Sequence, residues 1–87
     1  MNNVYYVYVH YKLSDGTPFY IGKGKDYRHN SKKNRNNYWK NIVNKLERTG
    51  YSYEIRMVIT GVSEKEAFDI ERERILFWKN IVDLANK

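Results

Sequence analysis

The feature that most restricts the fold is the run VYYVYVHY at residues 4–11, in which almost every residue is β-branched or aromatic. Residues of these types favour a β-strand. Asp15 and Gly16 follow and predict a turn, and Pro18 opens the next segment. FYIG at 19–22 then predicts a short second strand. The N-terminal quarter of the chain is therefore expected to be a β-hairpin.

The first strand has two different faces. Tyr6, Tyr8 and His10 share one face, and each ends in a polar group, whereas Val7 and Val9 lie on the other face. This row of rings with polar ends could line a functional site. The same pattern also suits ordinary sheet packing with hydroxyl groups that reach solvent.

One more strand and two helices are expected downstream. SYEIRMVIT at 52–60 alternates, which predicts a third strand whose buried side comprises Tyr53, Ile55, Met57 and Ile59. NNYWKNIVNKLERTG at 36–50 carries Trp39, Ile42, Val43 and Leu46 at helical spacing, and Gly50 ends that helix. SEKE at 63–66 has the form of a capping box, with Ser63 as N-cap, and starts a helix that runs through Asn80.

A short additional helix is expected over residues 26–37, so the predicted order is β-β-α-α-β-α. This order predicts an α+β fold, with a small three-stranded antiparallel sheet flanked by helices. The 87 residues are enough for a single domain, 1–87.

Composition excludes several classes of protein. The absence of cysteine excludes disulfides, thiolate metal sites and cysteine catalysis. No apolar run approaches the roughly 20 residues that cross a bilayer, and the N-terminus lacks a signal pattern. We therefore expect a soluble cytoplasmic protein without a membrane partner.

The net charge of +6 is unevenly distributed. Residues 23–48 hold nine lysines and arginines against two acids, whereas residues 54–73 hold six acids against three bases. A basic segment beside an acidic one indicates a polyanionic partner and a need for carboxylate, although a solvated surface gives the same charge pattern.

Glu71 occupies the middle of the apolar side of the last predicted helix, where its neighbours are Phe68, Ile75, Trp78 and Val82. Burying an unpaired carboxylate costs several kcal/mol, so this group needs a partner or a purpose. One interpretation is an ion pair with Arg28, Arg35 or Arg74. The other is a metal ligand or general base, since Mg²⁺ binds carboxylate oxygen and keeps several waters.

The stretch PFYIGKGKDYR at 18–28 places a tyrosine, two glycines, lysines and an arginine close together. Gly22 and Gly24 would let the backbone approach a phosphate, and Lys23 and Lys25 would hold it. The spacing differs from that of a Walker phosphate loop.

These motifs together resemble the GIY-YIG nuclease family. The resemblance is carried by Tyr6-Val7-Tyr8, by Tyr20-Ile21-Gly22, by Arg28 and by Glu71, which ends an A-x-x-x-E motif that starts at Ala67 on the last helix. The stretch Arg35-Asn36-x-x-Trp39-Lys40 matches one branch of the family, and the resemblance covers essentially the whole chain.

The resemblance implies a role for each matching residue. Tyr8 would be the tyrosine of the first motif, with Tyr6 where the family usually has glycine; a register shifted by two would make Tyr6 the reactive residue instead. Tyr20 matches the second motif, and Asn86 resembles a C-terminal asparagine of many members. Lys32 stands where many members carry histidine, so His29 or another side chain would take that role.

The implied activity is hydrolysis of a DNA phosphodiester that depends on one divalent metal, Mg²⁺ or Mn²⁺. A tyrosine would activate water, Glu71 would bind the metal and Arg28 would clamp the phosphate. Lys23 would assist the tyrosine. DNA-backbone contacts are expected from Lys23, Lys25, Lys32, Lys33, Arg35 and Lys40.

Two other functions fit the same residues. One is a catalytically impaired module that binds nucleic acid on the same fold, and the other is a basic domain that binds RNA or protein with Glu71 in a structural ion pair. Because family members often have a fused DNA-binding domain, the nuclease interpretation also implies a homodimer or an associated DNA-binding domain.

Overall fold

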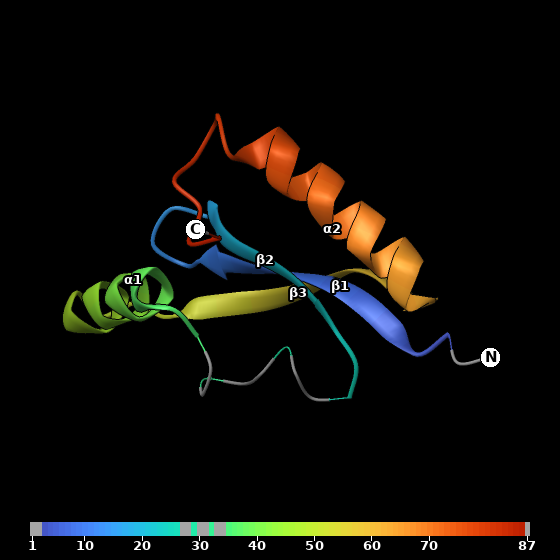
Figure 1. Cartoon of the computed structure of the whole chain (residues 1–87). Helices are drawn as coiled ribbons and strands as arrows, with labels where there is room; N and C mark the ends of the chain where they lie inside the picture. The colour runs from blue at the N-terminus through green and yellow to red at the C-terminus, as the bar shows by residue number, and fades with distance from the viewer. Residues whose placement is uncertain (1–2, 27–28, 30–31, 33–34, 87) are drawn as a thin grey trace.

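A computed structural model describes residues 3–26, 29, 32 and 35–86 of the chain. The element order is β1 (Tyr5–Lys12), β2 (Pro18–Gly24), α1 (Asn37–Arg48), β3 (Tyr53–Val62) and α2 (Glu64–Trp78). The strands form one antiparallel sheet in the order β2-β1-β3 (Figure 1). The predicted α+β class and three-stranded antiparallel sheet are therefore confirmed. Neither helix of the described chain has the length and apolar character that a membrane span requires.

The described residues contain two helices, not the three that were predicted. The expected short helix over 26–37 falls largely on residues outside the described ranges. Arg28 and Lys33, two of the predicted site residues, also lie outside them. The helix that was expected to run through Asn80 ends at Trp78.

The hairpin turn forms where Asp15 and Gly16 predicted it. Oδ1 of Asp15 accepts hydrogen bonds from the backbone N–H and the hydroxyl of Thr17, at 3.0 and 2.7 Å. Gly16 has a φ of 76°, in the left-handed region that favours glycine. This local chemistry sets the register that pairs Tyr8 with Gly22 and His10 with Tyr20.

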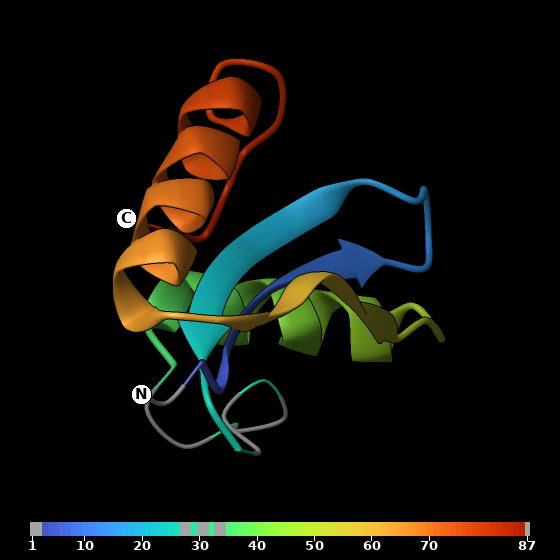
Figure 2. The ribbon, with the colours of Figure 1, turned by 90° about the vertical axis from the view of Figure 1, so that its right-hand side faces the viewer.

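The two helices lie on opposite faces of the sheet, as Figures 1 and 2 show. On the α2 face, Val7, Val9 and Ile21 pack against Ala67 of α2 and Leu84 of the C-terminal segment. A second apolar cluster on the α1 side comprises Phe19, Trp39, Val43 and Ala85. The predicted burial of Trp39 is confirmed, at 3% exposure.

Side-chain caps fix where the helices begin. The Asn36 side chain accepts from the backbone N–H of Trp39 and so caps α1. Ser63 and Glu66 form both halves of the predicted capping box at the start of α2. At the other end of α1, Gly50 with a φ of 82° terminates the helix as predicted.

β3 departs from its predicted alternation. The register of β3 against β1 shifts between Val7 and Tyr8 and again between Tyr5 and Tyr6, and Gly61 in the second shift has a φ of 70°. Each bulge inserts a residue and reverses the faces of the strand. As a result Ile59 pairs with Val7 and leaves its predicted face, where it is 37% exposed, while Val58 packs against the α2-side core. Met57 precedes the bulges and keeps its predicted face opposite Tyr8, but it is 42% exposed and its predicted burial is wrong.

The apolar stripe of α2 is also rotated relative to its prediction. Ala67 is fully buried, and Ile70, Ile75 and Trp78 pack against the core, whereas Phe68 is 47% exposed. Phe68 was expected on the buried stripe. The helix approaches the sheet at Ala67, and Phe68 lies about 100° around the helix from that residue.

His10 is the buried polar centre of the α1 side, with an exposure of 0%. The indole N–H of Trp39 donates to its Nδ1 at 2.9 Å, and its Nε2 lies 3.1 Å from the carbonyl oxygen of His29. Because the indole can only donate, the His10 proton sits on Nε2 and is given to that carbonyl. Burial lowers the pKa of His10 to about 4.

This buried histidine predicts acid-sensitive stability. The unfolded chain takes up a proton on His10 near its ordinary pKa of 6.5, whereas the folded protein does not until about pH 4. Above pH 6.5 His10 is neutral in both states and does not change the stability. As the pH falls below 6.5, protonation of His10 in the unfolded chain lowers the free energy of unfolding, which at pH 5 should be about 2 kcal/mol lower than at pH 7.5. Urea unfolding at both pH values measures it.

The variant His10→Gln should lose most of this dependence, and His29→Gln, which keeps His10, should retain it. An unchanged dependence in His10→Gln would contradict the assignment.

Candidate active site

The hydroxyl of Tyr8 reaches across β2 because the residue opposite it is glycine. Tyr8 pairs with Gly22, and a Cβ added to Gly22 would lie 2.6 Å from both Cζ and Oη of Tyr8. Real Cβ atoms do not approach that closely, so the ring occupies the space that a side chain at position 22 would need. Tyr6 is paired with Gly24 in the strand register. The first glycine of GKGK therefore accommodates a tyrosine ring.

Arg35 closes over these rings. It donates a hydrogen bond to the Tyr8 hydroxyl at 2.9 Å. Its guanidinium carbon lies 5.6 Å from the centre of the Tyr8 ring and 4.9 Å from that of Tyr20, and it also stacks over Trp39 at 5.7 Å. Stacked planes of this kind combine cation–π attraction with a fixed orientation of the donors. Arg35, which was predicted to contact the DNA backbone, is thus part of the tyrosine cluster.

The environment of Tyr8 favours its protonated form. Burial raises the pKa of the phenol, and the hydrogen bond and charge of Arg35 only partly oppose this. The side chain is 1% exposed. A ligand therefore reaches the hydroxyl only if the Arg35 guanidinium shifts.

The hydroxyl of Tyr6 is engaged differently. It donates to the carbonyl oxygen of Asp26 at 2.9 Å and accepts the backbone N–H of His29 at 3.1 Å. The Nδ1 atom of His29 also lies 3.1 Å away. Tyr6 therefore anchors the segment after β2 to the sheet and brings His29 beside the cluster, whereas the hydroxyl of Tyr8 is held by a cation.

Glu71 lies on the opposite helix, partly buried, at the outer edge of β2. Burial raises the pKa of its carboxyl group, and the charge of Lys23 and a hydrogen bond from the Lys23 backbone oppose the rise. Lys23 is the charged neighbour of Glu71, a pairing that the sequence analysis did not anticipate. The Lys23 ammonium also lies 3.4 Å from Glu64.

The two parts of the candidate site lie on opposite faces of β2. The Tyr8 hydroxyl lies over Gly22 on one face, whereas Glu71 is near Lys23, the next residue, whose side chain points to the other face. At Ile21, the residue before Gly22, the Asn86 side chain accepts a hydrogen bond from the backbone N–H at 2.9 Å and donates one to the carbonyl oxygen at 2.6 Å. Residues from β1, α2 and the C-terminal segment thus converge on residues 21–23.

The donors present suit one hard divalent cation. Glu71 supplies carboxylate oxygen in a partly buried position, and its raised pKa shows that its negative charge is incompletely compensated. Within the described ranges, no three His, Asp or Glu side chains group together as a metal cage. A single carboxylate is compatible with Mg²⁺, which retains several of its waters.

The other predicted phosphate-binding residues surround this site at different distances. Lys23 and Lys25 each lie 5.8 Å from the centre of the Tyr5 ring. Lys32 and Lys40 are exposed and line a shallow hollow beside Trp39 on α1. The structure therefore places Lys23 and Lys25 beside Tyr5, and Lys32 and Lys40 beside Trp39, which is one of the rings that Arg35 covers.

The structural roles of two residues of the cluster were missed in the sequence analysis. Arg35 was given a DNA contact, although it directly precedes the capping Asn36 and lies one helical turn before the buried Trp39, which is a signal that it points toward the same face. His10 was placed on the tyrosine face. Its bond to the carbonyl of His29 depends on Trp39, which occupies its other ring nitrogen, and no local sequence pattern predicts the contact between His10 and Trp39.

No protein-family model, curated protein or solved structure matches the chain significantly.

The contact between Tyr8 and Gly22 predicts the effect of a single methyl group. Gly22→Ala should lower the free energy of unfolding by about 2 kcal/mol, since overpacking a close contact costs about 1–3 kcal/mol. Chemical denaturation of Gly22→Ala, Tyr8→Ala and the double variant measures the coupling. In the Tyr8→Ala background the added methyl group should cost little, and an equal cost in both backgrounds would show that the ring is not the obstacle.

The stacking of Arg35 predicts that lysine is a poor replacement. Arg35→Lys keeps the charge but loses the plane that contacts three rings, so the free energy of unfolding should fall by about 1 kcal/mol. Arg48→Lys, in the last turn of α1, is the matched control and should change stability by much less. Equal stabilities of the two variants in urea would contradict the stacking role.

Proposed function

We propose that this chain is a metal-dependent DNA endonuclease of the GIY-YIG type, which hydrolyses a phosphodiester bond. The observation that carries the proposal is the Arg35 guanidinium held on the buried Tyr8 hydroxyl over Gly22. The partly buried Glu71 lies near Lys23 on the other face of the same edge strand. A phosphodiester requires cationic donors that are fixed before the charge of the transition state develops. A stacked guanidinium is such a donor.

Arg35 would bind the phosphate and leave the phenol. Its hydrogen bond to Tyr8 is the contact that a phosphate oxygen would replace, because a charge-assisted bidentate pair is stronger than a bond to a neutral hydroxyl. The same movement would uncover the buried hydroxyl. Arg28, outside the described ranges, keeps its implied role as a further phosphate ligand.

Tyr8 would act as a proton relay. Because its pKa is raised, the phenol is protonated at neutral pH and is a poor simple base. Its oxygen would take a proton from the attacking water while its own proton passes to a phosphate oxygen. His29 beside Tyr6 would complete the set of groups around the reacting phosphate.

Glu71 would hold the divalent cation, which when bound supplies Lewis-acid stabilisation of the leaving oxygen. The raised pKa argues against a structural ion pair. A carboxylate whose pKa is higher in the folded protein than in the unfolded chain destabilises the fold at neutral pH. The favourable contact with Lys23 therefore does not account for its position.

A second candidate is a module of the same fold that binds nucleic acid without cutting it. The burial of Tyr8 at 1% exposure favours this alternative, because the hydroxyl is covered by Arg35 in the free protein. Such a module would bind DNA with a steep salt dependence that is unaffected by Glu71.

Nicking of a supercoiled plasmid with Mg²⁺ or Mn²⁺ tests the proposal. The wild-type chain should nick, EDTA should abolish nicking, and Glu71→Gln and Tyr8→Phe should each reduce the rate roughly 100-fold or more. Tyr6→Phe should retain part of the activity, because the hydroxyl of Tyr6 holds backbone groups.

Glu73→Gln, on the exposed side of α2, is the matched control and should nick normally. Glu71→Gln should unfold at the same temperature as the wild type or higher, so a sharp loss of stability would support a structural role for Glu71. A wild-type chain that binds DNA but never nicks it would overturn the nuclease proposal in favour of the binding module.

A further inference from the structure

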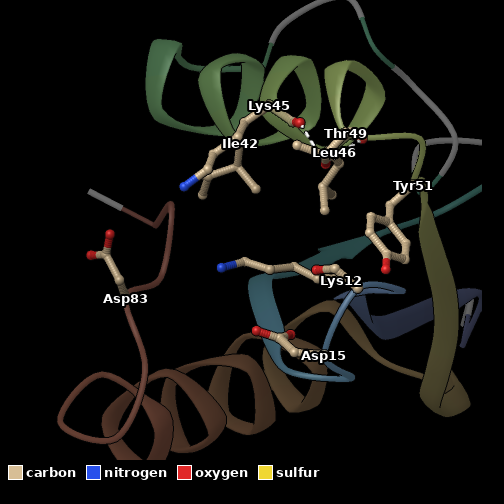
Figure 3. Close-up of a pocket in the computed structure, with 9 residues that line it drawn as sticks. Lys12, Asp15, Ile42, Lys45, Leu46, Thr49, Tyr51 and Asp83 are labelled. Carbon is tan, nitrogen blue, oxygen red and sulfur yellow. Dashed lines mark hydrogen bonds between the residues drawn. The ribbon is translucent and has the colours of Figure 1, made fainter.

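A pocket of about 450 Å³ lies where the hairpin turn, α1 and the C-terminal segment meet (Figure 3). Its volume is within the range of small-molecule sites. Its position is at the other end of β1 from Tyr6. The lining residues are Lys12, Ser14, Asp15, Ile42, Lys45, Leu46, Thr49, Tyr51 and Asp83.

Two ammonium groups project into the opening of this pocket. Figure 3 shows the side chains of Lys12 and Lys45 extending from the hairpin and from α1 into the space between these elements. The salt bridges found in the described part of the chain involve neither lysine. Lys12 also lowers the pKa of Asp15, so this carboxylate is close enough to feel its charge, although the two groups form no ion pair. Two convergent ammonium groups outside any ion pair of the described residues are suited to an anion.

The two carboxylates of the lining limit the size of that anion. Asp15 is engaged in the turn by its hydrogen bonds to Thr17, and Asp83 lies across the opening from Lys12 (Figure 3). With two lysines and two aspartates, the lining has no formal net charge. Because the aspartates offset part of the positive charge of the lysines, the lining suits one phosphate group better than a polyphosphate.

One wall of the pocket is apolar. Ile42 and Leu46 come from α1, and Tyr51 follows it with 49% of its surface exposed. An aromatic ring beside aliphatic side chains provides a stacking surface for a planar ring, and stacking on a base is worth about 1–3 kcal/mol in single-strand binding. Phosphate donors next to such a surface match the two parts of a nucleotide.

We propose that this pocket binds one nucleotide, with its phosphate between Lys12 and Lys45 and its base against Tyr51. The ligand could come from two sources that share this chemistry, a free nucleoside monophosphate or the 5′-phosphorylated end of a DNA strand. The pocket is separate from the tyrosine cluster, because Lys12 follows Tyr8 by four residues of extended strand, roughly 14 Å. Binding here needs neither Glu71 nor a metal.

An NMR titration of the ¹⁵N-labelled chain with deoxyadenosine 5′-monophosphate in EDTA tests the proposal. Amide shifts should be concentrated at the hairpin turn, the second half of α1 and Tyr51. Lys12→Gln and Lys45→Gln should each weaken binding roughly tenfold, as expected for the loss of one charged hydrogen bond. Lys79→Gln, at the end of α2, is the matched control and should bind normally.

Three further ligands divide the outcomes. Deoxyadenosine should bind much more weakly than its monophosphate, and so should inorganic phosphate. A 5′-phosphorylated oligonucleotide that shifts the same amides at lower concentration would assign the site to a DNA end, and a weaker response would assign it to the free nucleotide.

Absence of shifts around the pocket, shifts that persist in the double lysine variant, or inorganic phosphate binding as tightly as the nucleotide would overturn the proposal. Because no metal is present in the titration, its failure is independent of the result of the plasmid assay.

Discussion

The packing of the Tyr8 ring over Gly22 is the constraint on which the candidate site depends. Position 22 must lack a Cβ, because the ring fills that space, and only then does the phenol hydroxyl extend across β2 to Arg35. The guanidinium in turn uses the rings of Tyr8 and Tyr20 as its support. The glycine had been interpreted as an open approach for a phosphate. On this face it is filled by tyrosine, so a substrate would meet the guanidinium and the phenol, not bare backbone.

A second set of contacts, made by His10 and Tyr6, holds the segment after β2 next to the tyrosine cluster. His10 connects Trp39 of α1 to the carbonyl of His29, and Tyr6 binds the backbone of the same residue. Two side chains of β1, those of His10 and Tyr6, therefore hold the backbone of His29, which follows β2. The hydrogen bonds from Trp39 to His10 and from His10 to His29 can both form only when His10 is neutral. Burial, which lowers the pKa of His10, therefore helps to keep these contacts intact.

The elements could be predicted from the sequence, whereas the geometry of the site could be predicted only in part. Capping at Ser63 and the turn at Asp15 are local, so the chain shows them directly. The bulges of β3 depend on pairing with β1, which local alternation does not encode, and this is why Ile59 was assigned to the wrong face. Arg35 was likewise assigned to a surface contact, since its stacking joins three elements that are distant in sequence.

The position of Glu71 has a consequence for how a cation could be held. The Lys23 backbone lowers the pKa of this carboxyl group, and a carboxylate has about four acceptor positions, so capacity for a cation remains. Burial favours the protonated form, and a metal ligand must be ionised, so a proton and a cation compete for the same group. Lys23 lowers the pKa and keeps the carboxylate available, yet its positive charge also repels a cation. Its ion pair with Glu64 draws the ammonium toward the start of α2, and this contact reduces the repulsion beside Glu71 at the edge of β2.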